Sequence, residues 1–198
     1  MASSKSTHKP VHGHATTKFR QPQNTCFGCG VDNPDGMQLR FYYDEAKKHA
    51  LCDFNLGKKF QGPPGHVHGG IIATILDEAM GKVNKLRNVV ALTKKMEVIY
   101  QQPVPLHQDL RAIGWEKHVE GRKHTNVAEI RNSSGDVLAR SEGLFIAIDV
   151  EKMFAKFAAE GKLPDELRQQ MAAKFTNQQL GASAPVKPSR PRKSPRKP

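Results

Sequence analysis

The chain has 198 residues, of which 37% are hydrophobic, and a formal net charge of +12. This length suffices for one domain with a core, while the low hydrophobic content predicts that part of the chain stays outside that core. No run approaches the roughly 18 consecutive apolar residues of a membrane span, and none is predicted. The first 20 residues are too polar for a signal peptide. Their Ser/Thr-rich, acid-free composition is typical of transit peptides, but they lack an apolar helical face. The predicted location is therefore the cytoplasm, with import into an organelle as the alternative.

Most of the positive charge lies at the two ends of the chain. Residues 1–19 carry +3 and residues 181–198 carry +6, both without acidic residues, so only +3 is left for the remainder. The high isoelectric point therefore does not predict a nucleic-acid-binding face on the folded part. The basic, Pro-rich end cannot bury enough apolar area to fold, so residues 181–198 are predicted to form a disordered tail. Weak contact of this tail with nucleic acid or an anionic surface is the alternative use.

The first predicted elements precede a strong chain breaker. Residues 1–21 are expected to be a disordered arm, and residues 22–37 an ordered entry loop rich in turn-forming residues. Two strands are expected over 38–43 and 48–55. The sequence Gly62-Pro63-Pro64-Gly65 then ends this part of the chain.

A long amphipathic helix is predicted from Gly69 or Gly70 to Leu86, because apolar residues recur there at helical spacing. Four strands follow, near 89–102, 108–119, 122–132 and 136–149, with turns at Gly121-Arg122 and at 132–136. One long helix followed by consecutive strands predicts an α+β fold, in which the helix packs against an antiparallel sheet. Short helices are expected over 151–160 and 164–175, within a C-terminal helical extension of residues 151–180.

Three cysteines, Cys26, Cys29 and Cys52, cannot form a fully paired disulfide framework. Cys26 and Cys29 have the spacing of half a zinc site, but no second pair follows. The surrounding glycines and the Asn-Pro-Asp-Gly run favour a structural loop, with redox and metal-binding roles as alternatives. Cys52 lies in a strand-like stretch and is expected to pack as a small apolar group.

Residues 65–81, with the sequence GHVHGGIIATILDEAMG, combine a His-Gly-Gly turn with a carboxylate inside the helix that follows. The first amides of a helix have no intrahelical partner, and the helix dipole makes this end electropositive. A carbonyl oxygen that gains negative charge would be stabilised there. An acid on the same element, Asp77, suggests acyl-transfer chemistry.

This stretch resembles the active-site helix of hotdog-fold acyl-CoA thioesterases, in particular the phenylacetate-thioesterase-like (PaaI-type) branch. Four further segments match that family's pattern in order: NTCFGCG at 24–30 with NPDG at 33–36, ALT at 91–93, VIYQQPVPL at 98–106 and GDVLA at 135–139. The resemblance covers about residues 22–150. It implies a hotdog domain over these residues that hydrolyses an acyl-CoA to the free acid and CoA, without a metal or cofactor.

The spacing of Gly70 and Asp77 constrains how such a site can work. They are seven residues apart, which corresponds to roughly 10 Å along one helix at 1.5 Å per residue. A carbonyl held at the Gly70 amide is therefore out of reach of Asp77 on the same helix, but not of Asp77 from a second copy. The chain is accordingly predicted to form a homodimer with shared sites, or a homotetramer.

The predicted catalytic residues are Gly70, whose amide would polarise the thioester carbonyl, and Asp77, which would act as general base or as nucleophile. The resemblance implies that Thr93 hydrogen-bonds the carboxylate or the water. His68 is expected to shape the turn. Glu78 is the alternative acid, because related thioesterases place a Glu on this helix.

Coenzyme A carries several phosphates, so cations should surround its cleft. A glycine before the helix would let the ligand approach the backbone closely. A solvated charged face is the alternative explanation for these cations. The predicted substrate-binding residues are Gly69, Lys94, Lys95, Arg122 and Lys123, with His124 beside them.

Two other functions compete with the thioesterase hypothesis. A non-catalytic hotdog module could sense acyl-CoA; Lys94-Lys95 favours it, because many relatives have uncharged residues there, whereas the lack of a helix-turn-helix pattern argues against DNA binding. A hotdog enoyl-CoA hydratase fits less well, because that family's paired Asp and His are not found in its motif.

Overall fold

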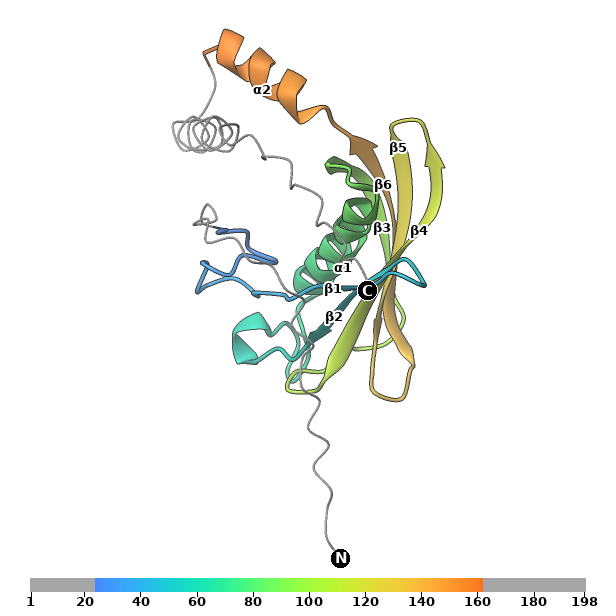
Figure 1. Ribbon diagram of the computed structural model, residues 1–198. Coiled ribbons are helices and arrows are strands. Elements are labelled where there is room, and N and C mark those ends of the chain that lie inside the picture. The colour runs from blue at the N-terminus through green and yellow to red at the C-terminus, as the bar shows by residue number, and fades with distance from the viewer. Residues whose placement is uncertain (1–23, 162–198) are drawn as a thin grey trace, which may run out of the picture.

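The computed structural model describes residues 24–161 (Figure 1). The predicted N-terminal arm, the second helix of the C-terminal extension and the basic tail lie outside these residues. The domain boundaries proposed from the sequence stay predictions.

Six strands form one antiparallel sheet in the order β1-β2-β4-β5-β6-β3. β3 is therefore an edge strand, although it comes third in the chain. The strands are β1 (Tyr42–Asp44), β2 (His49–Phe54), β3 (Ala91–Tyr100), β4 (Leu110–Glu120), β5 (Lys123–Arg131) and β6 (Val137–Ala147).

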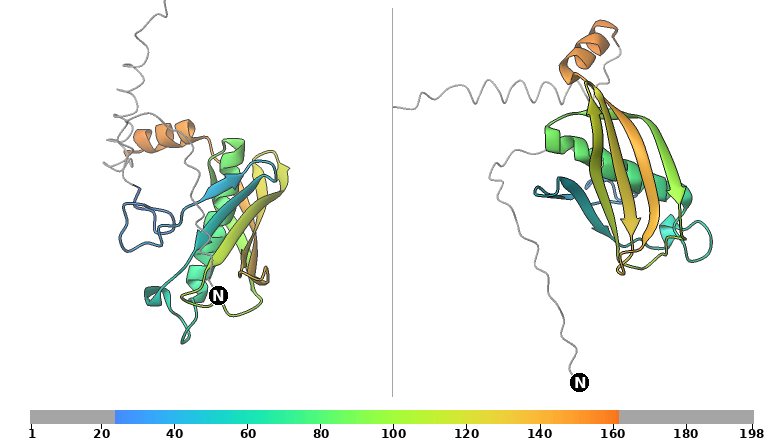
Figure 2. Two further views of the ribbon diagram at one scale, coloured as in Figure 1. Left: turned by 60° about the horizontal axis from the view of Figure 1, so that its bottom comes forward. Right: turned by 90° about the vertical axis from the view of Figure 1, so that its right-hand side faces the viewer.

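The long helix α1 (Gly69–Val83) lies across one face of this sheet (Figures 1 and 2). A 3-10 turn, η2 (Asn84–Arg87), continues it, so together they match the helix predicted to end at Leu86. Its apolar face packs against the inward residues of the strands and forms the core with them. The buried helix residues are Ile72, Ile75, Leu76, Ala79, Met80 and Val83. The predicted fold, an α+β hotdog architecture with a helix against an antiparallel sheet, is confirmed.

Gly114 in β4 sets how closely α1 approaches the sheet. A Cβ atom at this position would lie only 2.5 Å from the carbonyl oxygen of Ala79. Helix backbone and strand backbone are thus in contact here, which only a residue without a side chain allows.

The turns at 121–122 and 132–136 join β4 to β5 and β5 to β6, as predicted. Gly121 and Gly135 have φ angles of +56° and +91°, in the region that favours glycine. The predicted strand over 38–43 is wrong in its first part, because β1 begins only at Tyr42. Gln38 has a left-handed φ of 50°, and the Leu39 amide donates to the carbonyl of Gly28 in the entry loop, so the chain is held to the loop at the point where the strand was expected to begin.

Two short helices complete the described chain. η1 (Lys58–Phe60) lies before α1, and α2 (Val150–Ala159) follows β6, where Asp149 accepts a hydrogen bond from the Lys152 amide at 3.0 Å and caps the helix. α2 corresponds to the helix predicted over 151–160. None of the helices between residues 24 and 161 is long and apolar enough to cross a membrane.

Candidate active site

Asp77 and Thr93 form a hydrogen-bonded pair between α1 and β3. The Thr93 hydroxyl donates to Asp77 Oδ1 at 2.8 Å. Thr93 points towards the helix because it pairs in register with Phe145, whose ring is buried beside α1. The hydrogen bond to the carboxylate expected for Thr93 is therefore present, while the catalytic roles of both residues stay predictions.

A hollow of about 210 Å³ opens beside this pair. Its cations are Lys82 and Lys85, which the sequence analysis did not select. Helical periodicity would not have selected Lys85, because eight residues at 3.6 per turn place it about 80° around the helix axis from Asp77. The remaining lining residues are Glu78, Gly81, Ala91, Leu92 and Phe145.

The two neighbouring acids of α1 have opposite environments. Burial raises the pKa of Asp77, the hydrogen bond from Thr93 lowers it in part, and the charge of Glu78 raises it further. Burial alone would also raise the pKa of Glu78, but hydrogen bonds from Cys29 and the charge of Lys82 outweigh it and lower that pKa. Asp77 is thus the acid with a raised proton affinity, while Glu78 is held as a carboxylate by its neighbours.

His68 caps the N-terminus of α1. Its Nδ1 accepts a hydrogen bond from the Gly70 amide at 3.0 Å, and its carbonyl oxygen accepts from the amides of Ile71 and Ile72. The expectation that His68 shapes the turn agrees with this geometry. The Gly70 amide, predicted to bind the substrate carbonyl, already has a partner. No hydrogen bond is found for the Gly69 amide among the described residues.

Tyr100 lies beside this helix end and was missed in the sequence analysis as a site residue. Its hydroxyl donates to the carbonyl oxygen of Gly69 at 3.1 Å. Both residues line a mainly apolar hollow of about 430 Å³, together with Ile72 and the segment 101–104. Asp77 does not line this hollow, which agrees with the spacing argument that one helix cannot supply both halves of a site.

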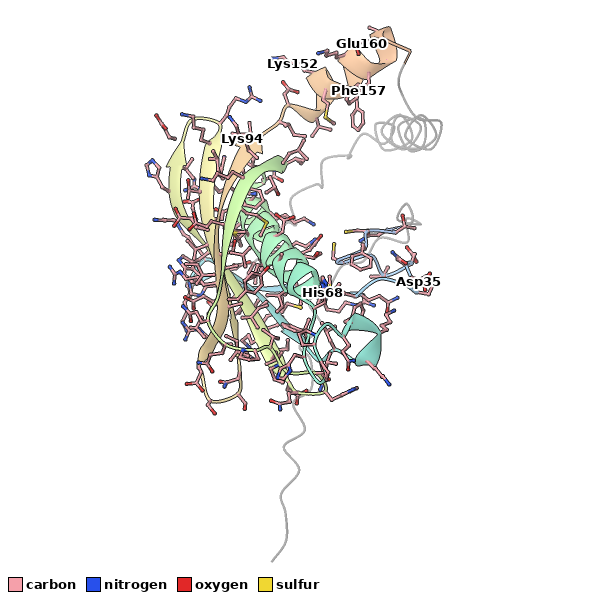
Figure 3. All side chains as sticks on the ribbon, turned by 180° about the vertical axis from the view of Figure 1, so that it is seen from behind. Asp35, His68, Lys94, Lys152, Phe157 and Glu160 are labelled. Carbon is pink, nitrogen blue, oxygen red and sulfur yellow. The ribbon has the colours of Figure 1, made fainter. Side chains whose placement is uncertain are left out.

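The predicted phosphate-binding cations are not among the residues that line either hollow. Lys94 lies at a β-bulge near the end of the sheet that leads to α2, whereas His68 lies at the far end of α1 (Figure 3). Lys95 pairs with Leu144 and lines a hollow on the face opposite α1. Arg122 donates to the Ala147 carbonyl oxygen at 2.9 Å, and Lys123 forms an ion pair with Glu120 at 3.4 Å. Their predicted contact with CoA stays untested.

Within the described part of the chain, one cluster has the side chains of a metal site. Cys26, Cys29 and Glu78 place their ligand atoms within 4.8 Å of one another.

Known proteins are similar to this chain over its central part. The sequence model of the thioesterase superfamily matches residues 64–139. Acyl-coenzyme A thioesterase THEM4 of Rattus norvegicus is 32% identical over 118 residues, which are 59% of this chain and 51% of that protein. The Xenopus laevis THEM4 is 30% identical over 114 residues, which are 57% of this chain and 51% of that protein. The chain thus spans about half the length of these curated relatives.

Solved structures show the same fold. A thioesterase superfamily protein has a TM-score of 0.60 at 31% identity, covering 62% of this chain and 60% of that one. The PaaI protein of E. coli has a TM-score of 0.53 at 16% identity, covering 57% and 81%. A Streptococcus mutans protein solved with acetyl CoA has a TM-score of 0.52 at 19% identity, covering 56% and 88%. Residues 64–139 therefore match the thioesterase superfamily, and the sheet and helix built around them have the hotdog fold.

Proposed function

We propose that the chain is an acyl-CoA thioesterase, which hydrolyses an acyl-CoA to the free acid and CoA. The observation that carries this proposal is the Asp77–Thr93 pair, which faces a hollow seven residues along α1 from a capped Gly-Gly helix start. The names of the THEM4 relatives, and the acetyl CoA bound to the Streptococcus mutans neighbour, support the same chemistry.

The catalytic unit in this proposal is a homodimer formed through the edge strand β3. Four large hydrophobic residues on and beside β3 are each more than half exposed: Val90, Leu92, Ile99 and Tyr100. Such an edge also presents unpaired backbone groups that a second strand can satisfy. Antiparallel pairing of two copies about a two-fold axis brings the start of one β3 to the end of the other.

This pairing would complete the site. Thr93 lies near the start of β3 and Tyr100 at its end. The Asp77–Thr93 pair of one copy would then face the Gly69–Tyr100 helix start of the second copy. The acid and the amide donors, which one helix keeps roughly 10 Å apart, would meet across the interface.

In the proposed chemistry, the thioester carbonyl oxygen accepts hydrogen bonds at the start of α1, where the helix dipole stabilises the oxyanion. Asp77 removes a proton from water, whose oxygen attacks the carbonyl carbon; the C–S bond breaks and the CoA thiolate takes up the proton. Alternatively, the Asp77 carboxylate attacks directly, CoA leaves, and water hydrolyses the resulting anhydride. Single turnover in ¹⁸O-water separates the routes: attack by water on the thioester puts the label into the acid product, whereas an anhydride hydrolysed at the Asp77 carbonyl carbon gives an unlabelled acid and leaves the label on Asp77.

Thiol release from a panel of short, long and aryl acyl-CoAs tests the enzyme proposal. Asp77→Asn should lower kcat by about 10²–10⁴-fold, since a base or nucleophile is removed while the residue's shape is kept. Asp35→Asn, in the entry loop, is the matched control and should leave turnover unchanged. Acyl-CoA binding without any hydrolysis by the wild-type chain would instead support the sensor function.

We also propose that the chain acts in the cytoplasm, the location expected from the sequence. One relative, 25% identical over 122 residues, is named an uncharacterised mitochondrial membrane protein of Saccharomyces cerevisiae. Imaging of a C-terminal fluorescent fusion tests this location, and mitochondrial fluorescence would contradict it.

A further inference from the structure

The entry loop touches α1 through its two cysteines, at the residue that follows Asp77. The Cys26 thiol donates to Glu78 Oε1 at 3.3 Å. Lys82 Nζ lies 2.9 Å from Cys29 Sγ and 3.3 Å from Glu78 Oε2. Two sulfurs, a carboxylate and an ammonium group thus meet in one cluster, although about 50 residues of sequence separate the cysteines from the helix residues.

The three acidic side chains have the geometry and the chemistry of a zinc site. Zn²⁺ binds thiolate sulfur at about 2.3 Å and carboxylate oxygen at about 2.0 Å, so two such ligands in a tetrahedron lie about 3.5 Å apart. The Cys26–Glu78 separation of 3.3 Å is close to this value. All three ligand atoms already lie within 4.8 Å of one another, so contraction by about 1 Å would complete the set. Thiolates select thiophilic ions over Mg²⁺ and Ca²⁺.

Lys82 supplies the charge balance that such a site needs. Two thiolates and one carboxylate carry three negative charges, which a divalent ion and one ammonium group neutralise. Lys82 is placed to donate to the Cys29 sulfur from outside the ligand set. Outer hydrogen bonds of this kind orient ligands and tune metal sites.

The loop is built to hold the two sulfurs against the helix. The Gly30 amide donates to the Cys26 carbonyl oxygen at 2.9 Å, and the Asn24 side chain accepts from the Cys26 amide at 3.2 Å. Any side chain at Gly30 would collide with the backbone of Cys26, since its Cβ would lie 2.4 Å from that carbonyl oxygen. A Cβ at Gly28 would lie 2.6 Å from the Glu78 side chain. Both glycines are therefore needed for the loop to close over Glu78.

We propose that Cys26, Cys29 and Glu78 bind one Zn²⁺ ion, with Lys82 hydrogen-bonded to the Cys29 thiolate and water in the fourth position. Both thiols lose their protons to solvent when the ion binds. The ion would fasten the entry loop to α1 beside Asp77 and so fix the wall of the hollow that Asp77 lines. The site does not depend on the thioesterase proposal.

Cobalt binding tests this site directly. The full-length chain, without an affinity tag, is reduced, freed of metal and titrated with Co²⁺ under a phosphine reductant. One equivalent should bind, with the near-ultraviolet thiolate-to-cobalt absorption and the strong visible bands of a tetrahedral site, and one equivalent of Zn²⁺ should abolish both. Zn²⁺ should also raise the melting temperature by several degrees.

Variants identify the ligands. Cys26→Ser and Cys29→Ser should each weaken binding at least about 100-fold and reduce the thiolate absorption. Glu78→Gln, which does not change the sequence of the entry loop, should weaken binding of the ion, while both thiolates still contribute to the absorption. Cys52→Ala, which removes the buried thiol of β2, is the control and should bind as the wild type does; circular dichroism checks that each variant folds. Absent thiolate absorption in the reduced wild type would overturn the proposal, and so would absorption that survives both Cys26→Ser and Cys29→Ser.

Discussion

At the scale of single residues, the start of α1 distinguishes two adjacent amides, of which the sequence suggested that of Gly70 as the donor to the carbonyl. His68 occupies the Gly70 amide, while the Gly69 amide has no partner within the described chain, and Gly69 lines the same hollow as Tyr100. We therefore expect the Gly69 amide to be the stronger donor to a substrate carbonyl, with Gly70 contributing only if the His68 ring turns away.

Gly69→Pro removes the N–H group at this position and leaves the rest of the helix start largely unchanged. Proline is favoured at the first position of a helix, and His68 already has the extended backbone, with ψ of 138°, that a residue before proline requires. The substitution should lower kcat by about 10²–10³-fold, as expected for loss of one oxyanion donor, with little change in stability. Steady-state kinetics and thermal unfolding measure the two effects.

Gly69→Ala is the matched control, because it keeps the amide. Its Cβ would lie 3.7 Å from the Tyr100 ring, an ordinary contact. Equal losses for Ala and Pro would show that space, and not the N–H group, matters at this position.

Cys52 should be the unreactive thiol of the described domain. It is fully buried in β2, and burial raises its pKa to about 12. At pH 8 only about one part in ten thousand would be thiolate. With a chelator and an aromatic disulfide reagent, the exposed Cys26 should react first in the native chain, the half-buried Cys29 more slowly because burial raises its pKa, and Cys52 only after addition of denaturant. A native fast phase that consumes all three thiols would contradict this burial.

At the scale of elements, the helix and the four long strands could be predicted because their patterns are local. Apolar residues at helical spacing define α1, and turn residues separate β4, β5 and β6. The start of the first strand was mispredicted because the Leu39 amide bonds to the entry loop, which no strand pattern reveals. For the same reason, the Cys26–Glu78 contact and the hollow with Lys85 could not be predicted, since both depend on distant segments that only the fold brings together.

The packing of α1 on the sheet should depend more on Gly114 than on Gly143. An added methyl group at Gly114 would meet the Ala79 backbone at 2.5 Å, so the helix must move. At Gly143 the nearest atom is the terminal methyl of Met80 at 2.9 Å, on a flexible side chain that can shift. Gly114→Ala should cost about 3 kcal/mol of unfolding free energy and Gly143→Ala about 1 kcal/mol.

Urea unfolding followed by circular dichroism compares the two variants on one scale. Equal midpoints would show that the helix and β4 are not in close backbone contact in solution.

At the scale of the whole molecule, the proposed shared site predicts that two inactive variants restore activity when they form a mixed dimer. Asp77→Asn and Gly69→Pro each inactivate a different half of the site. If the halves come from different copies, a mixed dimer has one fully wild-type site and one doubly altered site. Co-expression or refolding of an equal mixture should therefore restore about a quarter of wild-type activity.

Each variant alone, carried through the same procedure, is the control and should stay inactive. A mixture no more active than its components would place both halves in one chain. A chain that carries both substitutions is also mixed with wild type. The activity of this mixture shows how completely the copies exchange partners.

The two edges of the sheet differ in length, and this difference limits how many copies can add to such a dimer. β3 offers ten residues at one edge, whereas β1 offers only three at the other. Pairing through β3 would use up the long edge of both copies and leave only the two short β1 edges exposed. A strand of three residues is a poor template for further strands, so the joined sheet would be closed to fibre-like extension. A substitution that blocks the β3 pairing would leave the longer, apolar edge open, and aggregation would then compete with dimer formation.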